Sequence, residues 1–248
     1  MNTAIRRTAG IAAISLAALM PHQAAQAASA SVQLIWDSFQ INVIDTNLSD
    51  GITPTLEWIG QTSMVSSVID GIGWLPIDTV AFNWLDSGYD TYSAPGLELT
   101  GVYSNDWLFA EGISDLSTGG VIRAERYGAF TVTGDARIEA SVQAEVYASM
   151  SSAELASGGY IQADANLFFG DNTGSSLSPV AYLASDPALG VPQSLLLSTS
   201  IDLNGGAQTY LYMQPGVFIT AVPEPASVGM LLAGLALLAG RFGMRGRG

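Results

Sequence analysis

The sequence predicts an all-β fold, an antiparallel β-sandwich of which a jelly roll is one form. Over residues 137–150 every even position is apolar and every odd position is polar. This period of two fits a strand with one buried face and does not fit a helix. The same alternation recurs over 161–167, 197–203 and 207–213. Glycine, asparagine, aspartate and proline separate these runs, which is typical of antiparallel sheets with short connections.

The N-terminal segment has the pattern of a secretory signal peptide. Arg6 and Arg7 precede an apolar run of about a dozen residues, Pro21 follows it, and Ala25-Gln26-Ala27 offers small residues for cleavage. The apolar run is too short for a permanent bilayer-spanning helix. We therefore expect signal peptidase to remove residues 1–27, with cleavage after Ala30 as the alternative.

The first half of the remaining chain is the less regular half. Apolar residues from Val32 to Trp36 keep one parity and those from Phe39 to Val43 keep the other, so a β-bulge near Asp37-Ser38 is expected. The turn residues that punctuate the chain delimit five further strands. These are Thr55–Ile59, Ser63–Ile69, Thr79–Trp84, Leu97–Tyr103 and Val121–Glu125.

The second half contains a predicted β-hairpin. Asn204-Gly205-Gly206 separates the alternating runs 197–203 and 207–213, and Asn-Gly between two such runs is a strong hairpin signal. Residues 151–159 and 172–178 are rich in small residues and are predicted to be loops.

The C-terminal end carries a second sorting signal. Val222-Pro223-Glu224-Pro225 is followed by the uncharged segment 226–240 and then by Arg241, Arg245 and Arg247. Extended to Met244, a helix here would reach about 28 Å, close to the hydrocarbon thickness of a bilayer. The terminal arginines favour the cytoplasmic side and would act as a stop-transfer signal. A single transmembrane helix, with the preceding domain outside, is therefore expected during sorting.

These three parts in this order resemble the PEP-CTERM sorting domain of Gram-negative bacteria, over about residues 222–248. The resemblance implies recognition of Pro223, Glu224 and Pro225 by an exosortase-like membrane enzyme. It also implies passage from an inner-membrane intermediate to the cell surface, the outer membrane or the extracellular matrix. Such proteins often occur in organisms that make exopolysaccharide and biofilm.

Between the signals, residues 28–221 form one predicted exported domain whose composition excludes several functions. It has 21 acidic residues against three arginines, a net charge of −18 that repels nucleic acid. Cysteine and lysine are absent from the chain, and the single histidine, His22, lies in the signal peptide. A Ser-His-Asp triad, a cysteine nucleophile and a histidine zinc site are therefore excluded. Carboxylate-pair glycoside hydrolysis is the catalytic chemistry left open, although no acidic pair stands out.

One acidic loop is a candidate calcium site. Asp45, Asn47 and Asp50 precede Gly51, and Glu57 follows at the spacing of a closing bidentate acid if one residue is inserted. A polar turn built on Asp50-Gly51 is the favoured alternative. No other cofactor is expected.

The tryptophans offer a second candidate site. Trp58, Trp74, Trp84 and Trp107 lie within fifty residues, and core packing is the favoured role because most stand beside aliphatic strand residues. Trp74 and Trp107, next to glycine, proline or aspartate, are the candidates for exposed rings that stack on sugars.

The sequence thus predicts a non-catalytic exported surface or matrix protein, sorted by an exosortase-like system and linked to exopolysaccharide. A polysaccharide-binding or calcium-stabilised adhesive module is the alternative. A carboxylate-pair glycosidase is the second alternative.

Overall fold

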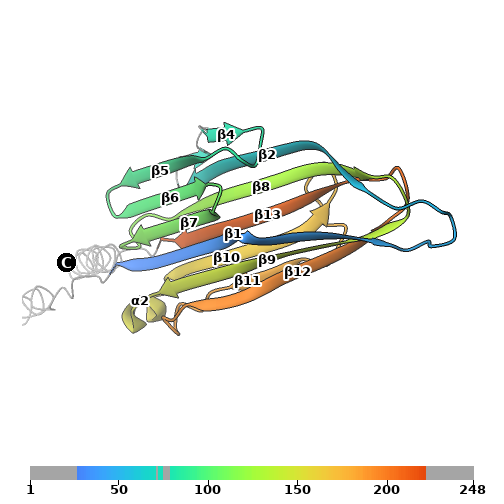
Figure 1. The fold of residues 1–248 in the computed structure, drawn as a ribbon. Coiled ribbons are helices and arrows are strands. Elements are labelled where there is room, and N and C mark those ends of the chain that lie inside the picture. Colours follow the sequence, from blue (N-terminus) through green and yellow to red (C-terminus); the bar gives the residue numbers. More distant parts are fainter. Residues whose placement is uncertain (1–26, 71, 75–78, 222–248) are drawn as a thin grey trace, which may run out of the picture.

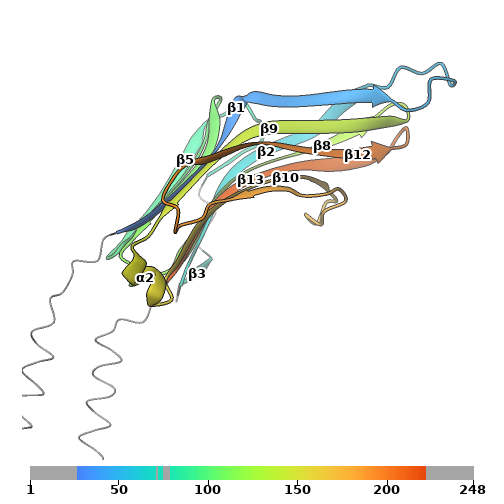
Figure 2. The ribbon, with the colours of Figure 1, turned by 90° about the horizontal axis from the view of Figure 1, so that it is seen from below.

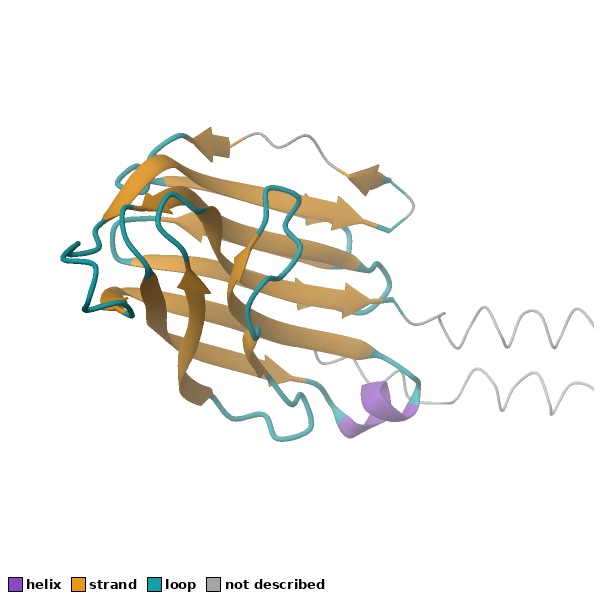
Figure 3. Ribbon diagram, turned by 90° about the vertical axis from the view of Figure 1, so that its right-hand side faces the viewer, coloured by secondary structure: helices purple, strands orange, loops and turns teal. Residues whose placement is uncertain are grey.

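Thirteen antiparallel strands and one short helix make up the part of the chain that the computed structural model describes, residues 27–70, 72–74 and 79–221. The strands form two facing layers (Figures 1 and 3). The elements are β1 (Ala28–Asp45), β2 (Leu56–Ile69), β3 (Gly73–Trp74), β4 (Thr79–Ala81), β5 (Gly88–Ala94), β6 (Leu97–Tyr103), β7 (Trp107–Ser114), β8 (Gly120–Val132), β9 (Ala136–Ser149), α2 (Ser152–Ala156), β10 (Tyr160–Gly170), β11 (Ala181–Ala184), β12 (Gln193–Leu203) and β13 (Gln208–Thr220).

The two sheets confirm the predicted all-β, two-layer architecture. The six-stranded sheet has the order β12-β9-β1-β7-β6-β5. The seven-stranded sheet has the order β11-β10-β13-β8-β2-β3, with β4 also paired to β2. The apolar parity of each alternating run points between the sheets, as in β9, where Ile138, Val142 and Val146 are buried. The expected signal peptide and C-terminal helix lie outside the described residues.

The predicted bulge in β1 is present and is stabilised by a side chain. The register of β1 against β9 shifts between Ile35 and Gln40. Here the Ser38 hydroxyl donates to the carbonyl of Ile35 at 2.6 Å and accepts from the amide of Gln143 at 2.7 Å. Ser38 thus supplies the hydrogen bonds that the interrupted ladder lacks. The sandwich bends where β1 changes direction (Figure 2).

The predicted hairpin at Asn204-Gly205-Gly206 is wrong, although both of its strands exist. β12 pairs with β9 in one sheet, whereas β13 pairs with β8 and β10 in the other. The turn therefore carries the chain across the core, and the amide of Gly206 donates to Val132 at 2.7 Å. The β8–β9 connection crosses at the same end, because β8 and β9 also lie in different sheets. The alternation of apolar and polar residues could not reveal this. Each strand buries every second residue whether its neighbour in the sequence lies beside it in the same sheet or faces it across the core.

Other details also differ from expectation. The predicted strand Thr79–Trp84 ends at Ala81, and the predicted strand Val121–Glu125 is part of the longer β8. The predicted strands Thr55–Ile59 and Ser63–Ile69 are one strand, β2, whose register shifts between Trp58 and Gly60. The predicted loop 151–159 contains α2, which begins with a capping box between Ser151 and Glu154.

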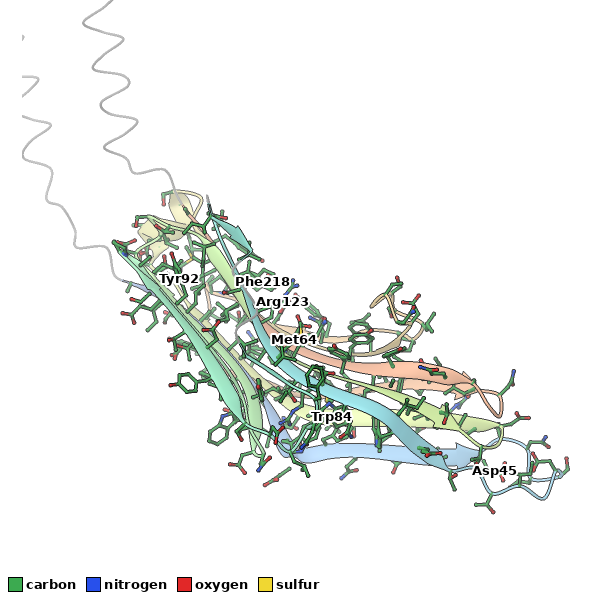
Figure 4. All side chains as sticks on the ribbon, turned by 90° about the horizontal axis from the view of Figure 1, so that it is seen from above. Asp45, Met64, Trp84, Tyr92, Arg123 and Phe218 are labelled. Carbon is green, nitrogen blue, oxygen red and sulfur yellow. The ribbon has the colours of Figure 1, made fainter. Side chains whose placement is uncertain are left out.

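The described chain begins and ends at the same end of the sandwich, where β1 starts and β13 stops (Figure 1). The loop that follows Asp45 lies at the opposite end (Figure 4). The loop after Asp45 therefore lies at the end of the domain that is remote from residue 221, where the described chain stops.

Candidate ligand-binding face

The outward side of the seven-stranded sheet lies on the inner side of the bend. Figure 4 labels Met64, Arg123 and Phe218 there, on β2, β8 and β13. An outer sheet face is ordinarily covered by exposed charged residues, yet most side chains here are half-buried. We call this surface the concave face; it is formed by the outward residues of β10, β13, β8 and β2.

A row of stacked aromatic rings crosses the concave face. Phe168, Tyr212 and Tyr127 are directly opposite one another on β10, β13 and β8. The ring centroids of Phe168 and Tyr212 are 5.0 Å apart with planes 11° apart, and those of Tyr212 and Tyr127 are 5.8 Å and 25° apart. Tyr210 stacks on Tyr212 at 6.2 Å. The Tyr212 hydroxyl donates to the carbonyl of Asp171 at 2.8 Å, which holds the row in place.

A polar strip runs beside the aromatic row. Asn166 is paired with Gln214, and the Gln214 side chain hydrogen-bonds Glu125. One position further along the face, Asp164 on β10 and Arg123 on β8 are both paired with Gly216 of β13. A Cβ on Gly216 would lie 3.1 Å from Cγ of Arg123 and 3.3 Å from Oδ1 of Asp164. Glycine therefore lets these two side chains occupy the space above β13.

The acids of the strip are poorly solvated. Burial raises the pKa of Asp164 from 3.8 to about 6, although Arg123 and a hydrogen bond from Asn166 lower it. Burial also raises the pKa of Glu125, against the same opposing effect of Arg123. Partly buried carboxylates can accept hydrogen bonds from a polar ligand, and the guanidinium beside them can donate to it, with little competition from water.

Arg123 is placed to contact a ligand. Its guanidinium carbon lies 5.0 Å from the ring centroid of Phe218, and the side chain also lines a hollow of about 190 Å³ with Ser66, Val68 and Val121. The other two arginines of the described chain are engaged elsewhere. Arg126 is buried, and Arg137 pairs with Asp202 at 2.8 Å on the other sheet.

Arg126 is a structural residue of the core. Its guanidinium carbon lies 4.2 Å from the ring centroid of Trp36, and it donates to the Ser63 hydroxyl at 3.2 Å and the Ser104 carbonyl at 2.7 Å. Burial lowers its pKa to about 10, so that it stays charged at neutral pH. Arg126 therefore ties both sheets together at the bend.

The acidic loop is organised as turns. Oδ1 of Asp45 accepts from the amide of Asn47 at 2.8 Å, and Oδ1 of Asp50 accepts from the amide of Ile52 at 2.7 Å. Glu57 lies on β2, opposite Thr131. Among the described residues no group of three or more acidic or histidine side chains could hold a metal ion. Asp45 and Asp50 thus accept hydrogen bonds from the backbone two residues further on, as a polar turn requires.

The structure does not bring the tryptophans together in one surface cluster. Trp58 and Trp84 pack against each other with centroids 4.6 Å apart, in the core cluster with Trp36, as the packing interpretation expects. Trp107 is 41% exposed on β7 of the six-stranded sheet, and Trp74 belongs to β3 of the seven-stranded sheet, with its side chain outside the described residues. The two candidates for sugar stacking therefore belong to different sheets.

Comparison with known proteins identifies the C-terminal tail. Residues 221–247 match the PEP-CTERM protein-sorting motif. The match covers about a tenth of the chain. No curated protein and no solved structure matches the chain.

The PEP-CTERM motif contains every residue predicted for sorting. Pro223, Glu224 and Pro225 lie at its start and Arg241, Arg245 and Arg247 at its end; all are outside the described residues. The motif implies export, processing by an exosortase-like membrane enzyme and sorting toward the cell surface. In the described part of the chain, no helix has the length and apolar character needed to cross a membrane.

The sequence prediction missed the residues of the concave face. Their signal was present: Tyr210, Tyr212 and Tyr127 stand at the solvent-facing parity of their strands, where small polar residues are usual. The sequence does not show that these tyrosines lie next to one another, because β8, β10 and β13 are adjacent only in the folded sheet.

Proposed function

We propose that the domain of this PEP-CTERM protein is a non-catalytic polysaccharide-binding module of the cell surface or extracellular matrix, and that the concave face is its binding surface. The sorting motif supports the location, since it implies export and sorting toward the cell surface. The observation that carries the proposal is the aromatic row beside the polar strip on one concave sheet face.

The chemistry of the face suits a sugar chain. Sugar rings present apolar C–H surfaces and many hydroxyls, so they bind where aromatic groups lie next to hydrogen-bonding side chains. Tyr127 and Phe218 flank the strip that contains Asp164, Glu125 and Arg123. Because neighbouring strands hold the side chains, little conformational entropy is lost on binding.

The charge of the domain selects among polysaccharides. With a net charge of −18, the domain repels polyuronates and other polyanions at low ionic strength. The single arginine on the concave face is flanked by two acids, Asp164 and Glu125, rather than by further bases. A neutral polysaccharide is therefore the favoured ligand class.

One observation favours a second candidate, a glycoside hydrolase. Asp164 and Glu125 share the face, and both have raised pKa values, as a general acid requires. However, they are two strands and two residues apart, which places their Cα atoms roughly 12 Å from each other. Each carboxyl group is also already engaged within the face, Asp164 by a hydrogen bond with Asn166 and Glu125 by one with Gln214. Binding without cleavage is therefore the better-supported function.

Titration of residues 28–221 with the neutral exopolysaccharide of the producing organism tests the proposal. Tyr127→Ala and Phe218→Ala should each weaken binding about tenfold, as expected for the loss of one ring contact. Tyr147→Ala is the matched control, because Tyr147 points outward from β9 on the other sheet. Equal affinity in all four proteins would refute the binding face, and release of reducing sugar would favour the hydrolase.

A further inference from the structure

The edge of the six-stranded sheet formed by β12 differs from the other sheet edges. β12 has eleven residues and, among the described strands, pairs with β9 alone. At the other edges β11, β3 and β4 have four, two and three residues, and the seven-residue β5 carries Asp90 near its middle. The parts of β1 and β2 that have a partner on one side only, residues 40–45 and 56–62, are shorter than β12 and carry Asp45 and Glu57. Short or charged edges resist pairing with further strands, whereas a long uncharged edge invites it. β12 has no charge from Gln193 to Ile201.

This edge also exposes apolar side chains. Leu195 and Leu196 of β12 are 47% and 54% exposed, and Leu189 and Val191 in the preceding loop are exposed as well. Figure 2, seen from below, looks onto β12. Every second residue of the strand directs its amide and carbonyl away from β9, and no described strand takes these groups. The edge thus combines free backbone groups with an apolar surface.

The distribution of charge limits what can bind there. Elsewhere two copies of a domain with a net charge of −18 repel each other. The one charged residue of β12, Asp202, is neutralised by Arg137 through two hydrogen bonds of 2.8 and 3.0 Å. In an antiparallel pairing of two β12 strands, the two Asp202 residues would stand at opposite ends. A second copy can therefore approach along this edge without opposing like charges.

We propose that β12 pairs with β12 of a second copy of this chain, antiparallel and centred near Leu197, which joins the two six-stranded sheets into one. Backbone hydrogen bonds between the strands provide the attraction, and the exposed leucines are buried in the same contact. The interface is isologous, so it closes as a dimer and does not propagate.

Cysteine cross-linking in cells that export the full chain tests this pairing. The chain has no cysteine, so a single introduced thiol reports only its own surroundings. Leu196→Cys, Leu197→Cys and Ser198→Cys, the three positions closest to the two-fold axis, are compared with Leu48→Cys, which is 86% exposed at the far loop. At least one β12 variant should form a disulfide-linked species of doubled mass, because a residue near the two-fold axis lies within disulfide reach of its copy. The Leu48→Cys protein should keep the single mass.

Light scattering on the exported protein purified from the cell surface gives an independent measurement. The native protein should have twice the monomer mass, Leu196→Lys should halve it, and the matched control Leu48→Lys should leave it doubled. A monomeric native protein, or a Leu196→Lys protein that is folded by circular dichroism and still dimeric, would overturn the proposal. Single mass in all three β12 cysteine variants would also overturn it, and so would a cross-link from β12 to a different protein in place of a second copy.

Discussion

Replacing Asp164 by asparagine should stabilise the folded domain at neutral pH, and the gain should vanish in acid. Burial holds the pKa of this carboxyl at about 6, above its ordinary 3.8. The folded state therefore binds the proton more tightly than the unfolded state does, so Asp164 costs stability increasingly as the pH rises from about 4 to about 6. The asparagine variant carries no charge there, and its side chain can keep the hydrogen bond with Asn166.

The size of the effect follows from the two pKa values. The difference between 3.8 and about 6 corresponds to at most about 3 kcal/mol. Because Asp164 is only half-buried, water screens part of this penalty, and we expect a gain of about 1–2 kcal/mol above pH 6.

Urea unfolding of both proteins at several pH values between about 4 and about 8 measures this gain. Asp202→Asn is the matched control, because Arg137 lowers the pKa of Asp202, so this substitution should change stability in the opposite direction. If the difference between wild type and Asp164→Asn does not change with pH, the carboxyl is not desolvated and the account of the concave face is wrong.

Four further predictions concern the bulge, the acidic loop and the two signals. Ser38→Ala should destabilise the domain by about 1–3 kcal/mol, because it leaves the amide of Gln143 without its acceptor; an unchanged urea midpoint would show that water replaces the hydroxyl. Millimolar calcium should leave the melting temperature unchanged, since the acids of loop 45–52 already serve as turn acceptors; a rise with calcium would instead show a metal site by linkage. Intact mass of the exported form should begin at Ala28, and recovery of surface material that still carries residue 1 would contradict the signal peptide. Replacing residues 223–225 by alanine should leave a longer species in the inner membrane; if fractionation finds this variant and wild type on the surface at the same mass, the tail is an ordinary anchor.

Much of the local structure could be predicted because its causes are local. A β-strand with one buried face requires apolar residues at every second position, and the runs 137–150 and 161–167 meet this requirement without reference to the rest of the chain. The bulge in β1 was visible for the same reason, because an odd number of extra residues, here three, reverses the parity between Trp36 and Phe39. The sorting tail was also readable, since its charge, length and Pro-Glu-Pro sequence are properties of one continuous segment.

Pairing is not a local property, and this explains the failed hairpin and the missed face. The turn at residues 204–206 suits either a hairpin or a crossing between sheets, and only the packing of β12 on β9 and of β13 on β8 decides between them. Likewise, Asp164 and Arg123 are 41 residues apart and meet over Gly216 because three strands adjoin in the sheet. Sequence alone therefore determined that the chain is exported, sorted and built of alternating strands. The tertiary structure decided which strands adjoin, and with that which side chains share a surface where a ligand can bind, because register and strand order are set by long-range contacts.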